Sequence, residues 1–130
     1  KENFFLTNCD TIIKADYNNI LETHSREKND ITIVVAEKKF TIPYGVCDFK
    51  EEKFRFKEKP SFKHNVNTGF YIISKNCLDV LKIEKKLDFN EFLEICIKNK
   101  KKINYYKINH SQWIDVGQMD KYKQILNKSI

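Results

Sequence analysis

The stretch Ile31-Thr32-Ile33-Val34-Val35-Ala36, ITIVVA, contains no charged residue and consists almost entirely of β-branched side chains. Such a run predicts a strand covered on both faces, as in an α/β sheet, because a strand with one solvated face would alternate apolar and polar residues. Phe70-Tyr71-Ile72-Ile73 is a second run that predicts a buried strand. We therefore expect a sheet whose two faces are both packed against other elements.

Two segments carry the periodicity of helices. In the segment over residues 16–27, apolar side chains and one histidine recur at positions i, i+3, i+4 and i+7, which predicts an amphipathic helix. His24 at the end of that stripe is either a ligand or a partly buried side chain at a helix end, and the second interpretation is favoured. Asp88 and Glu91 form a capping-box pattern that predicts the start of another helix. The apolar stripe of this second helix comprises Phe89, Phe92, Leu93, Cys96 and Ile97.

The remaining elements are shorter. They are a hairpin with a strand around residues 44–49 and a half-exposed strand over 53–57, a short helix that Asn76 can cap, a strand over 102–108 and a final helix over 119–128. Helices separated by buried strands indicate a layered α/β fold. Because no repeat, low-complexity segment or linker interrupts this order, we expect residues 1–130 to form one domain.

The formal charge of +6 does not by itself indicate nucleic-acid binding. Only Arg26 and Arg55 among the 24 basic residues are arginine, and the lysines are mixed with acidic residues along the chain. Nucleic-acid surfaces instead cluster arginine and lysine with interleaved aromatics. The densest basic run, Lys98 to Lys102, falls at a predicted helix C-terminus, where the helix dipole favours cations. We expect a solvated surface and no nucleic-acid partner.

Four cysteines, Cys9, Cys47, Cys77 and Cys96, are present, without a C-x-x-C pair or a histidine at metal-ligand spacing. This pattern predicts buried free thiols in a reducing compartment. No apolar run approaches the ~20 residues that span a bilayer, and the first residues do not form a signal peptide. We therefore expect a cytoplasmic protein without a membrane partner.

Glycine and proline are concentrated in a few turns that also carry polar side chains. Taken singly, these segments have ordinary interpretations: Asp10 as a helix cap or turn residue, Glu58-Lys59 as a solvated pair, Asn67-Thr68-Gly69 as a tight turn and Asp115 as part of a turn. Ligands of open α/β sheets bind at the carboxyl ends of strands, where such turns lie. These turns are therefore where the sequence predicts a site.

Taken together and in order, the segments resemble the sugar-phosphate nucleotidyltransferases, also called nucleotide-sugar pyrophosphorylases. The segments that carry the resemblance are FFLTNCDTII, ITIVVAEKKFTIPYGVCDF, FRFKEKPSF, VNTGFYIIS and WIDVGQMDKY. They cover the whole chain and are most similar to bacterial enzymes that activate sugars for surface polysaccharides. The resemblance implies a Rossmann-like mixed sheet with flanking helices. It also implies transfer of a nucleotidyl group from an NTP to a sugar 1-phosphate, with release of pyrophosphate.

The resemblance also implies roles for individual residues. Asp10 and Asp115 match the two metal-binding aspartates of the family, and a Mg²⁺ ion between them would neutralise two carboxylates that otherwise repel. Lys59 would place its charge on the sugar phosphate. The residues implied to contact the sugar are Gly45, Glu58, Asn67 and Gly69. Trp113 is expected to be a packing anchor.

One part of the family pattern is not in this chain. The family has a glycine-rich, phosphate-binding loop before its first metal-binding strand, and the three glycines here all lie elsewhere. We therefore expect an incomplete, C-terminal part of the catalytic domain that is inactive by itself, with a free sheet edge that would permit a homo-oligomer. The alternative is a non-catalytic sugar-phosphate-binding or assembly module of the same fold.

Overall fold

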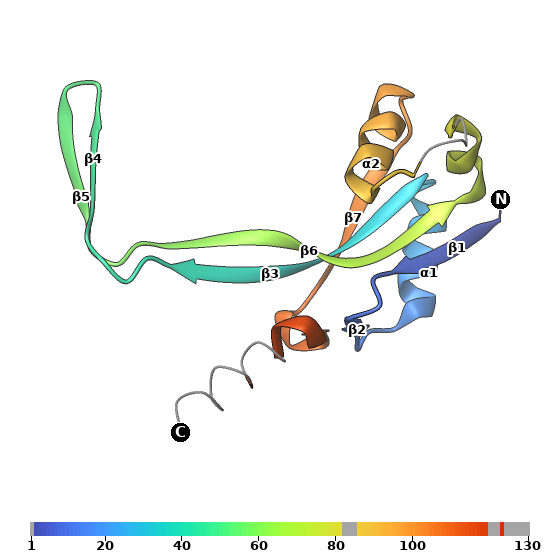
Figure 1. Ribbon diagram of the computed structural model, residues 1–130, viewed down its shortest axis with the longest axis horizontal. Helices are drawn as coiled ribbons and strands as arrows, with labels where there is room; N and C mark the ends of the chain where they lie inside the picture. The colour runs from blue at the N-terminus through green and yellow to red at the C-terminus, as the bar shows by residue number, and fades with distance from the viewer. Residues whose placement is uncertain (1, 82–85, 120–122, 124–130) are drawn as a thin grey trace.

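The computed structural model describes residues 2–81, 86–119 and 123. Figure 1 shows a body in which helices pack around a sheet, and a long two-stranded arm that leaves the body and bends at its end. We use "arm" for residues 37–65 and "body" for the other described residues. The arm is formed by continuations of two strands of the body's sheet.

The sheet of the body has four strands in the order β1-β6-β3-β7. Their bounds are Asn3–Thr7 for β1, Ser61–Ser74 for β6, Ile31–Thr41 for β3 and Ile103–Ile108 for β7. Strand β6 is antiparallel to both β1 and β3, whereas β3 and β7 are parallel. The sheet is therefore mixed, as predicted.

The ITIVVA stretch lies in the middle of this sheet and is covered on both faces. Ile31 packs in a cluster with Phe92 and Cys96 of helix α2, Phe89–Lys98. Val34 and Ala36 pack in a second cluster with Ile20 of helix α1, Tyr17–Arg26. Because successive side chains of a strand point to opposite faces, the two clusters form two cores, one on each side of the sheet.

Both predicted helices are present, and each has a side-chain cap at its N-terminus. Asp16 accepts hydrogen bonds from the backbone of Asn18 and Asn19, and Asp88 and Glu91 form the predicted capping box. His24 is 1% exposed, so it is more deeply buried than predicted. Its ring nitrogens lie 2.8 Å from Thr32 Oγ1 and 3.1 Å from Ser74 Oγ. His24 therefore joins α1 to two strands of the sheet.

The prediction that Asn76 caps a short helix is wrong. Residues Lys75–Val80 form a 3-10 helix, η1, whose N-cap is Ser74, and Asn76 lies inside it. The Asn76 amide instead donates to Asp30 Oδ1 at 3.1 Å. Of the predicted helix over 119–128, residues 120–122 and 124–128 lie outside the described residues.

The arm begins where β3 and β6 lose their other neighbours. Lys38 to Thr41 of β3 pair with Ser61 to His64 of β6, and the parallel pairing with β7 ends at Ala36. At the end of the arm, β4, Val46–Lys50, and β5, Lys53–Lys57, form the predicted hairpin. All five residues of β5 are exposed, so the prediction of a half-exposed strand there is wrong.

A second small sheet lies beside the first and was not predicted. Strand β2, Thr11–Ile13, pairs antiparallel with β8, Trp113–Asp115, which follows the 3-10 turn η2, His110–Gln112. Each strand has only three residues, which is too short for a periodic pattern in the sequence to reveal. This pair joins two segments that are far apart in the sequence.

The four cysteines are all free, but only two are buried. Cys77 and Cys96 are 0% exposed, as predicted for free thiols in a core, whereas Cys9 and Cys47 are exposed. The prediction of four buried thiols is therefore wrong for these two. Within the described residues, no helix is both long and apolar enough to cross a membrane.

Candidate active site

Asp10 and Asp115 are brought together by the small sheet. Thr11 lies opposite Asp115 in the register of β2 and β8. The pairing continues one step further, because the backbone amide of Val116 donates to the carbonyl of Asp10 at 2.9 Å. Asp10 and Asp115 therefore both lie at the same end of this two-stranded sheet.

Gly117 shows how closely the two carboxylates approach. A Cβ atom placed on Gly117 would lie 3.0 Å from Asp10 Oδ2 and 3.5 Å from Asp115 Oδ1. Both oxygens thus lie within 3.5 Å of one point that a larger side chain would fill. We call Asp10 and Asp115 the carboxylate pair, and Gly117 has no side chain to crowd either member.

Asp115 also has a local structural role. Its Oδ1 accepts a hydrogen bond of 3.1 Å from the backbone of Gln118, and residues 116–119 are helical. The side chain therefore caps a helical turn with one oxygen. The same oxygen lies near the Cβ position of Gly117, and a carboxylate oxygen can accept a second bond, so Asp115 Oδ1 and the exposed carboxylate of Asp10 can both serve a ligand.

The donor set fits a hard cation such as Mg²⁺ in part. Carboxylates are the protein ligands that Mg²⁺ commonly uses, one or two at a time, with water and phosphate oxygens completing the octahedron. Among the described residues, no group of three or more His, Cys, Asp or Glu side chains is arranged to hold a metal ion. A cation at the carboxylate pair would therefore depend on ligands from a bound phosphate compound and water.

Gly69 lies directly beside Asn8, two residues before Asp10, and Asn67 is bonded to Gly69. The pairing of β3 with β6 passes from Val34–Phe70 to Val35–Asn67, so Thr68 and Gly69 form a bulge. Gly69 has a φ of +80°, and its carbonyl accepts a hydrogen bond of 2.9 Å from the backbone of Asn8. A bulge at this point turns the backbone of β6 toward the loop that carries Asp10.

The amide of Asn67 is already used within the bulge. Its Oδ1 accepts from the Gly69 backbone at 2.9 Å, and its Nδ2 donates to the hydroxyl of Tyr71 at 2.8 Å. Burial raises the pKa of Tyr71, and the bond from Asn67 partly opposes that rise. Because an amide has a second donor hydrogen and a second lone pair, exposed Asn67 retains one bond of each kind for a ligand.

Gly45, Glu58 and Lys59 lie on the arm, apart from the carboxylate pair. They border the β4–β5 hairpin, which Figure 1 shows at the far end of the arm from β2. Glu58 Oε2 lies 3.0 Å from the Cβ position of Gly45. The backbone of Lys59, at a φ of +43°, donates to the Tyr44 carbonyl at 3.2 Å. The predicted site residues therefore form two groups in this structure.

A cavity of about 320 Å³ lies next to Asp115. Trp113, Ile114 and Met119 give it apolar walls, and Lys38 and His110 add basic groups. Trp113 is partly buried and packs against the core cluster of α1, which confirms its predicted role as a packing anchor. This cavity was not predicted, because its lining comes from the base of the arm and from residues around β8.

The comparisons with known proteins agree on one family. A family model described as nucleotidyl transferase matches residues 1–129. A glucose-1-phosphate adenylyltransferase of Lachnospira eligens is 34% identical over 124 residues, which cover 87% of this chain and 29% of the relative. A probable mannose-1-phosphate guanylyltransferase 3 of Arabidopsis thaliana is 29% identical over 126 residues, covering 92% of this chain and 37% of the relative. The chain thus spans about a third of the length of these relatives.

Solved structures share the fold. The crystal structure of HddC from Yersinia pseudotuberculosis superposes with a TM-score of 0.62 at 23% identity, covering 98% of this chain and 56% of that one. A putative glucose-1-phosphate thymidylyltransferase from Bacillus anthracis gives a TM-score of 0.56 at 17% identity, covering 88% and 49%. At these identities, the likeness supports a Rossmann-like α/β arrangement for the chain.

Proposed function

The chain belongs to the nucleotidyl transferase family, and we propose that in its complete protein it serves to transfer a nucleotidyl group from an NTP to a sugar 1-phosphate. A phosphate oxygen of the sugar attacks the α-phosphorus, the bond to the β-phosphate breaks, and pyrophosphate leaves with the displaced electron pair. The names of the relatives from L. eligens and A. thaliana support this reaction class.

The observation that carries the proposal is the approach of Asp10 to Asp115 beside Gly117. We propose that these two carboxylates hold Mg²⁺. When bound, the ion would neutralise negative charge on the phosphates and orient them for in-line displacement. The contribution of the chain is to hold two carboxylates near one point and to place a glycine, without a side chain, beside them.

The sugar phosphate would be bound by residues of the arm together with Asn67 and Gly69 of the β6 bulge. We propose that Lys59 neutralises the sugar phosphate, that Glu58 and Asn67 bond sugar hydroxyls, and that Gly45 and Gly69 let the backbone approach the sugar. Gly69 lies beside the loop of Asp10, and Asn67 is bonded to Gly69. Gly45, Glu58 and Lys59 would meet the same substrate only when the arm lies over the carboxylate pair.

The setting of the reaction is a further part of the proposal. The segments that resemble bacterial surface-polysaccharide enzymes support a cytoplasmic role in supplying activated sugars for such polymers. The scattered lysines support a protein without a nucleic-acid partner. The free edge of strand β1, which within the described residues pairs only with β6, supports association into a homo-oligomer.

A pyrophosphate-release assay on the complete protein tests the reaction, with ATP, GTP, UTP and dTTP each paired with several sugar 1-phosphates. We expect turnover with one pair or a few related pairs. Asp10→Asn and Asp115→Asn should each lower kcat/KM by about 10²–10³, because metal stabilisation of transition-state charge is worth several kcal/mol. Asp79→Asn, at an exposed aspartate of η1, is the matched control and should retain activity.

Two results would contradict the proposal. Unchanged turnover in both Asp10→Asn and Asp115→Asn would exclude the carboxylate pair from catalysis. Specific binding of sugar phosphates without turnover by the complete protein would favour a binding module. We also expect no turnover by residues 1–130 alone, because the chain contains no glycine-rich phosphate loop.

A further inference from the structure

Thr68 lies in the bulge of β6 and makes two hydrogen bonds that point in different directions. It is 2% exposed. Its hydroxyl donates to the carbonyl of Val34 at 2.8 Å, and its own carbonyl accepts from the hydroxyl of Thr11 at 2.9 Å. Thr68 thus connects the central strand β3 with strand β2.

Thr11 lies next to both members of the carboxylate pair. It follows Asp10 directly in sequence, and it faces Asp115 across the β2–β8 pairing. Strands β2 and β8 form a sheet that is separate from the four-stranded sheet of the body. A side-chain hydrogen bond from Thr11 to β6 is therefore one of the direct links between the two sheets.

The partner at the other end of this link is firmly held. Val34 is 0% exposed and lies in the core cluster of α1. The strand around it is paired with β6 on one side and β7 on the other. The two hydroxyls therefore tie the carboxylate pair to the least exposed part of the sheet.

We propose that Thr11 and Thr68 are positioning residues that fix the separation of Asp10 and Asp115 and thereby set the affinity of the pair for a divalent cation. The inference rests on the proposed function, since the cation is the one proposed to serve the transfer reaction. Neither threonine needs to touch the cation, and both act through the backbone that carries the two aspartates.

The hydroxyl and the shape of Thr11 can be changed separately. Thr11→Val keeps the branched shape and removes the donor, whereas Thr11→Ser keeps the donor and removes the methyl group. Thr41→Val is the matched control, because Thr41 also makes a hydroxyl bond, at 2.9 Å to Ser61 Oγ, but on the exposed arm. Thr11 is only partly buried, so the change to valine at this position should leave the protein folded.

Mn²⁺ binding to the complete protein, followed from the electron paramagnetic resonance of free Mn²⁺, measures the affinity directly. Residues that orient metal ligands typically change metal affinity by 10–100-fold when mutated. We therefore expect Thr11→Val to raise the Kd for Mn²⁺ by about 10-fold or more. Thr11→Ser and Thr41→Val should stay close to the wild-type value.

Thr68→Val tests the second residue, and its folding is checked by circular dichroism. A folded Thr68→Val protein should bind Mn²⁺ as weakly as Thr11→Val. If it does not fold, Thr68→Ser takes its place. That variant retains the hydroxyl and should bind Mn²⁺ as the wild type does, and a loss of affinity there would overturn the role of Thr68.

The outcomes separate this inference from the proposed function. If Asp10→Asn and Asp115→Asn leave Mn²⁺ affinity unchanged, the proposed metal site itself is wrong. If those two variants lose affinity while Thr11→Val binds as the wild type does, the positioning role is wrong and the metal site stands. Equal weakening by Thr11→Ser and Thr11→Val would also overturn the inference, because packing of the methyl group would then be responsible.

Discussion

The carboxylate pair lies at one end of the small β2–β8 sheet, which is tied to a strand covered on both faces, whereas Gly45, Glu58 and Lys59 lie on an arm that leaves the body (Figure 1). In the body, β3 has a hydrogen-bonded neighbour on each side. In the arm, the described residues form only two-stranded ribbons. Isolated two-stranded ribbons are marginally stable. The proposed metal side is therefore preformed, while the proposed sugar side depends on the position of the arm.

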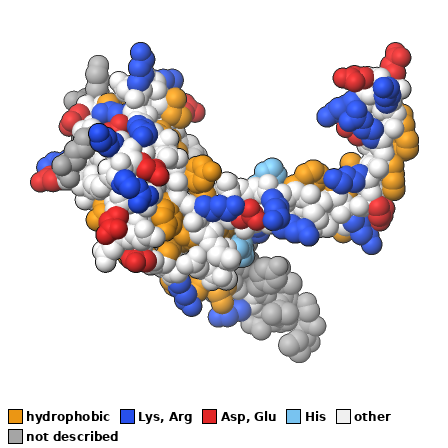
Figure 2. All heavy atoms as spheres, turned by 180° about the vertical axis from the view of Figure 1, so that it is seen from behind, with side chains coloured by type: hydrophobic (Ala, Val, Ile, Leu, Met, Phe, Trp, Pro, Cys, Tyr) orange, Lys and Arg blue, Asp and Glu red, His pale blue; other side chains and the backbone are white. Residues whose placement is uncertain are grey.

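The surface of the arm supports the same contrast. Tyr44 and Phe49 are 74% and 75% exposed. In the register of the hairpin, Phe49 faces Phe54 and Cys47 faces Phe56, so one face is apolar and the other carries basic residues. Figure 2 shows hydrophobic side chains exposed along the arm, with lysines and arginine beside them. Apolar side chains gathered on one exposed face are a feature of surfaces that take part in contacts.

Thiol reactivity should show the largest difference between the two regions. Burial, with smaller contributions from Cys96 and Asp30, raises the pKa of Cys77 in the body to about 12. At pH 8 only about one Cys77 in 10⁴ is then a thiolate, the reactive form. Cys47 on the arm is exposed. We expect iodoacetamide at pH 8 to modify Cys47 at least about 10³-fold faster than Cys77.

Peptide mass mapping at successive times measures the two rates. Cys9 is exposed and should react about as fast as Cys47. Cys96, whose pKa is also raised by burial, should react about as slowly as Cys77. In urea all four should react at similar rates, which serves as the control. Rapid modification of Cys77 in the native protein would mean that the core beneath α2 opens as readily as the arm.

Two glycine substitutions, one in the body and one in the arm, compare how tightly the two regions are packed through their effect on the free energy of unfolding. Gly69→Ala places a side chain at a φ of +80° and a Cβ 2.5 Å from Asn8 Nδ2. Backbone strain of this kind costs about 1–3 kcal/mol. In Gly45→Ala the Cβ would approach the end of the Phe56 ring at 2.7 Å, but that ring is 59% exposed and free to move. We expect Gly45→Ala to cost less than about 0.5 kcal/mol, as for most surface substitutions.

Urea unfolding of the two variants beside the wild type gives both free energies of unfolding. We expect the free energy of unfolding to fall for Gly69→Ala and to change little for Gly45→Ala. If the two variants lost similar amounts of unfolding free energy, the arm would be as tightly packed as the bulge beside Asp10. Gly69→Ala should in addition weaken Mn²⁺ binding, because Asn8 and the loop of Asp10 must move.

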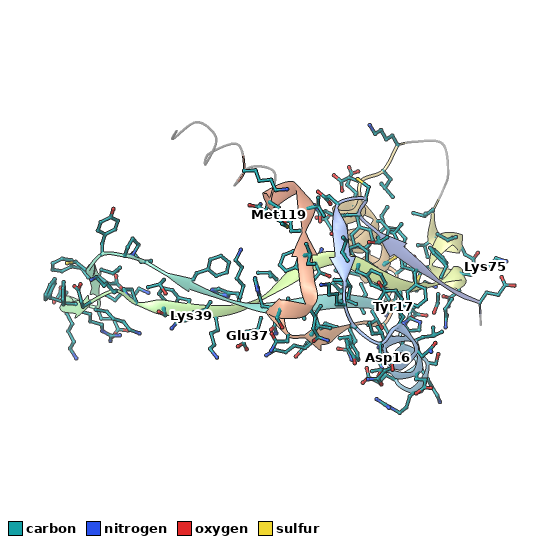
Figure 3. The ribbon with its side chains drawn as sticks, turned by 90° about the horizontal axis from the view of Figure 1, so that it is seen from below. Asp16, Tyr17, Glu37, Lys39, Lys75 and Met119 are labelled. Atoms are coloured by element: carbon teal, nitrogen blue, oxygen red, sulfur yellow. The ribbon has the colours of Figure 1, made fainter. Side chains whose placement is uncertain are left out.

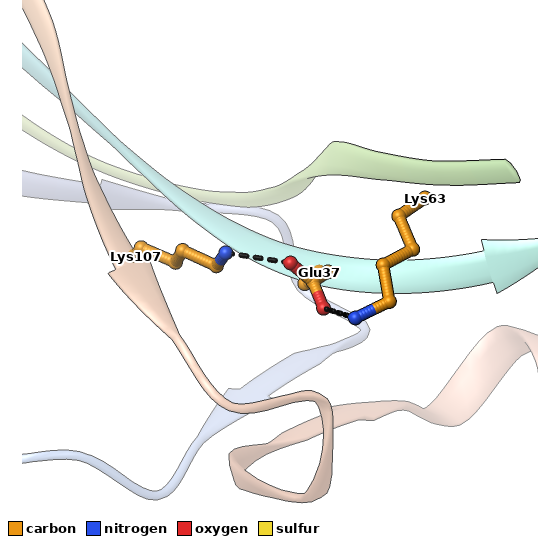
Figure 4. A network of polar contacts seen from close by, with 3 residues as sticks. All are labelled: Glu37, Lys63 and Lys107. Carbon is orange, nitrogen blue, oxygen red and sulfur yellow. Dashed lines mark hydrogen bonds and ion pairs between the residues drawn. The ribbon is translucent and has the colours of Figure 1, made fainter.

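The smallest effect is expected where the arm joins the body. Glu37 lies between Lys63 of β6 and Lys107 of β7, with oxygen–nitrogen distances of 3.0 and 2.7 Å (Figure 4). Figure 3 shows Glu37 at the base of the arm and Lys39 further out. The hydrogen bonds and charges of Lys107 and Lys63 lower the pKa of Glu37 below its usual 4.5. A carboxyl with a lowered pKa in the folded state stabilises that state above the unfolded pKa.

This stabilisation should therefore be present above about pH 4.5 and be lost as the pH falls through the lowered value. Thermal unfolding of Glu37→Gln and the wild type between pH 7 and pH 3 measures it. We expect a small difference in Tm at pH 7 that disappears in acid, because exposed ion pairs contribute little. A difference that persists unchanged at pH 3 would show that the charge of Glu37 is not its cause.

Much of the fold was predictable because its signals are local. The buried run ITIVVA, the stripe after Asp88 and the capping box depend on neighbours within a few residues. The run and the capping box are confirmed. The stripe is confirmed for Phe89, Phe92, Leu93 and Cys96, but the prediction is wrong for Ile97, which is 63% exposed. The family was predictable from the order of five segments, and the match over residues 1–129 confirms it. Two of the wrong predictions, a cap at Asn76 and a half-exposed β5, concern short elements whose state depends on distant partners.

The amino-acid sequence by itself determined the two capped helices and the buried strand runs of the body, and it named Asp10 and Asp115 as candidates. Only the tertiary structure decided that these two residues from opposite ends of the chain meet beside Gly117, and that Thr68 and Thr11 link them to β3. It also decided that Gly45, Glu58 and Lys59 lie on a separate arm. Periodicity and caps are set by contacts along the chain, whereas the distance between remote residues depends on how strands pair and bulge.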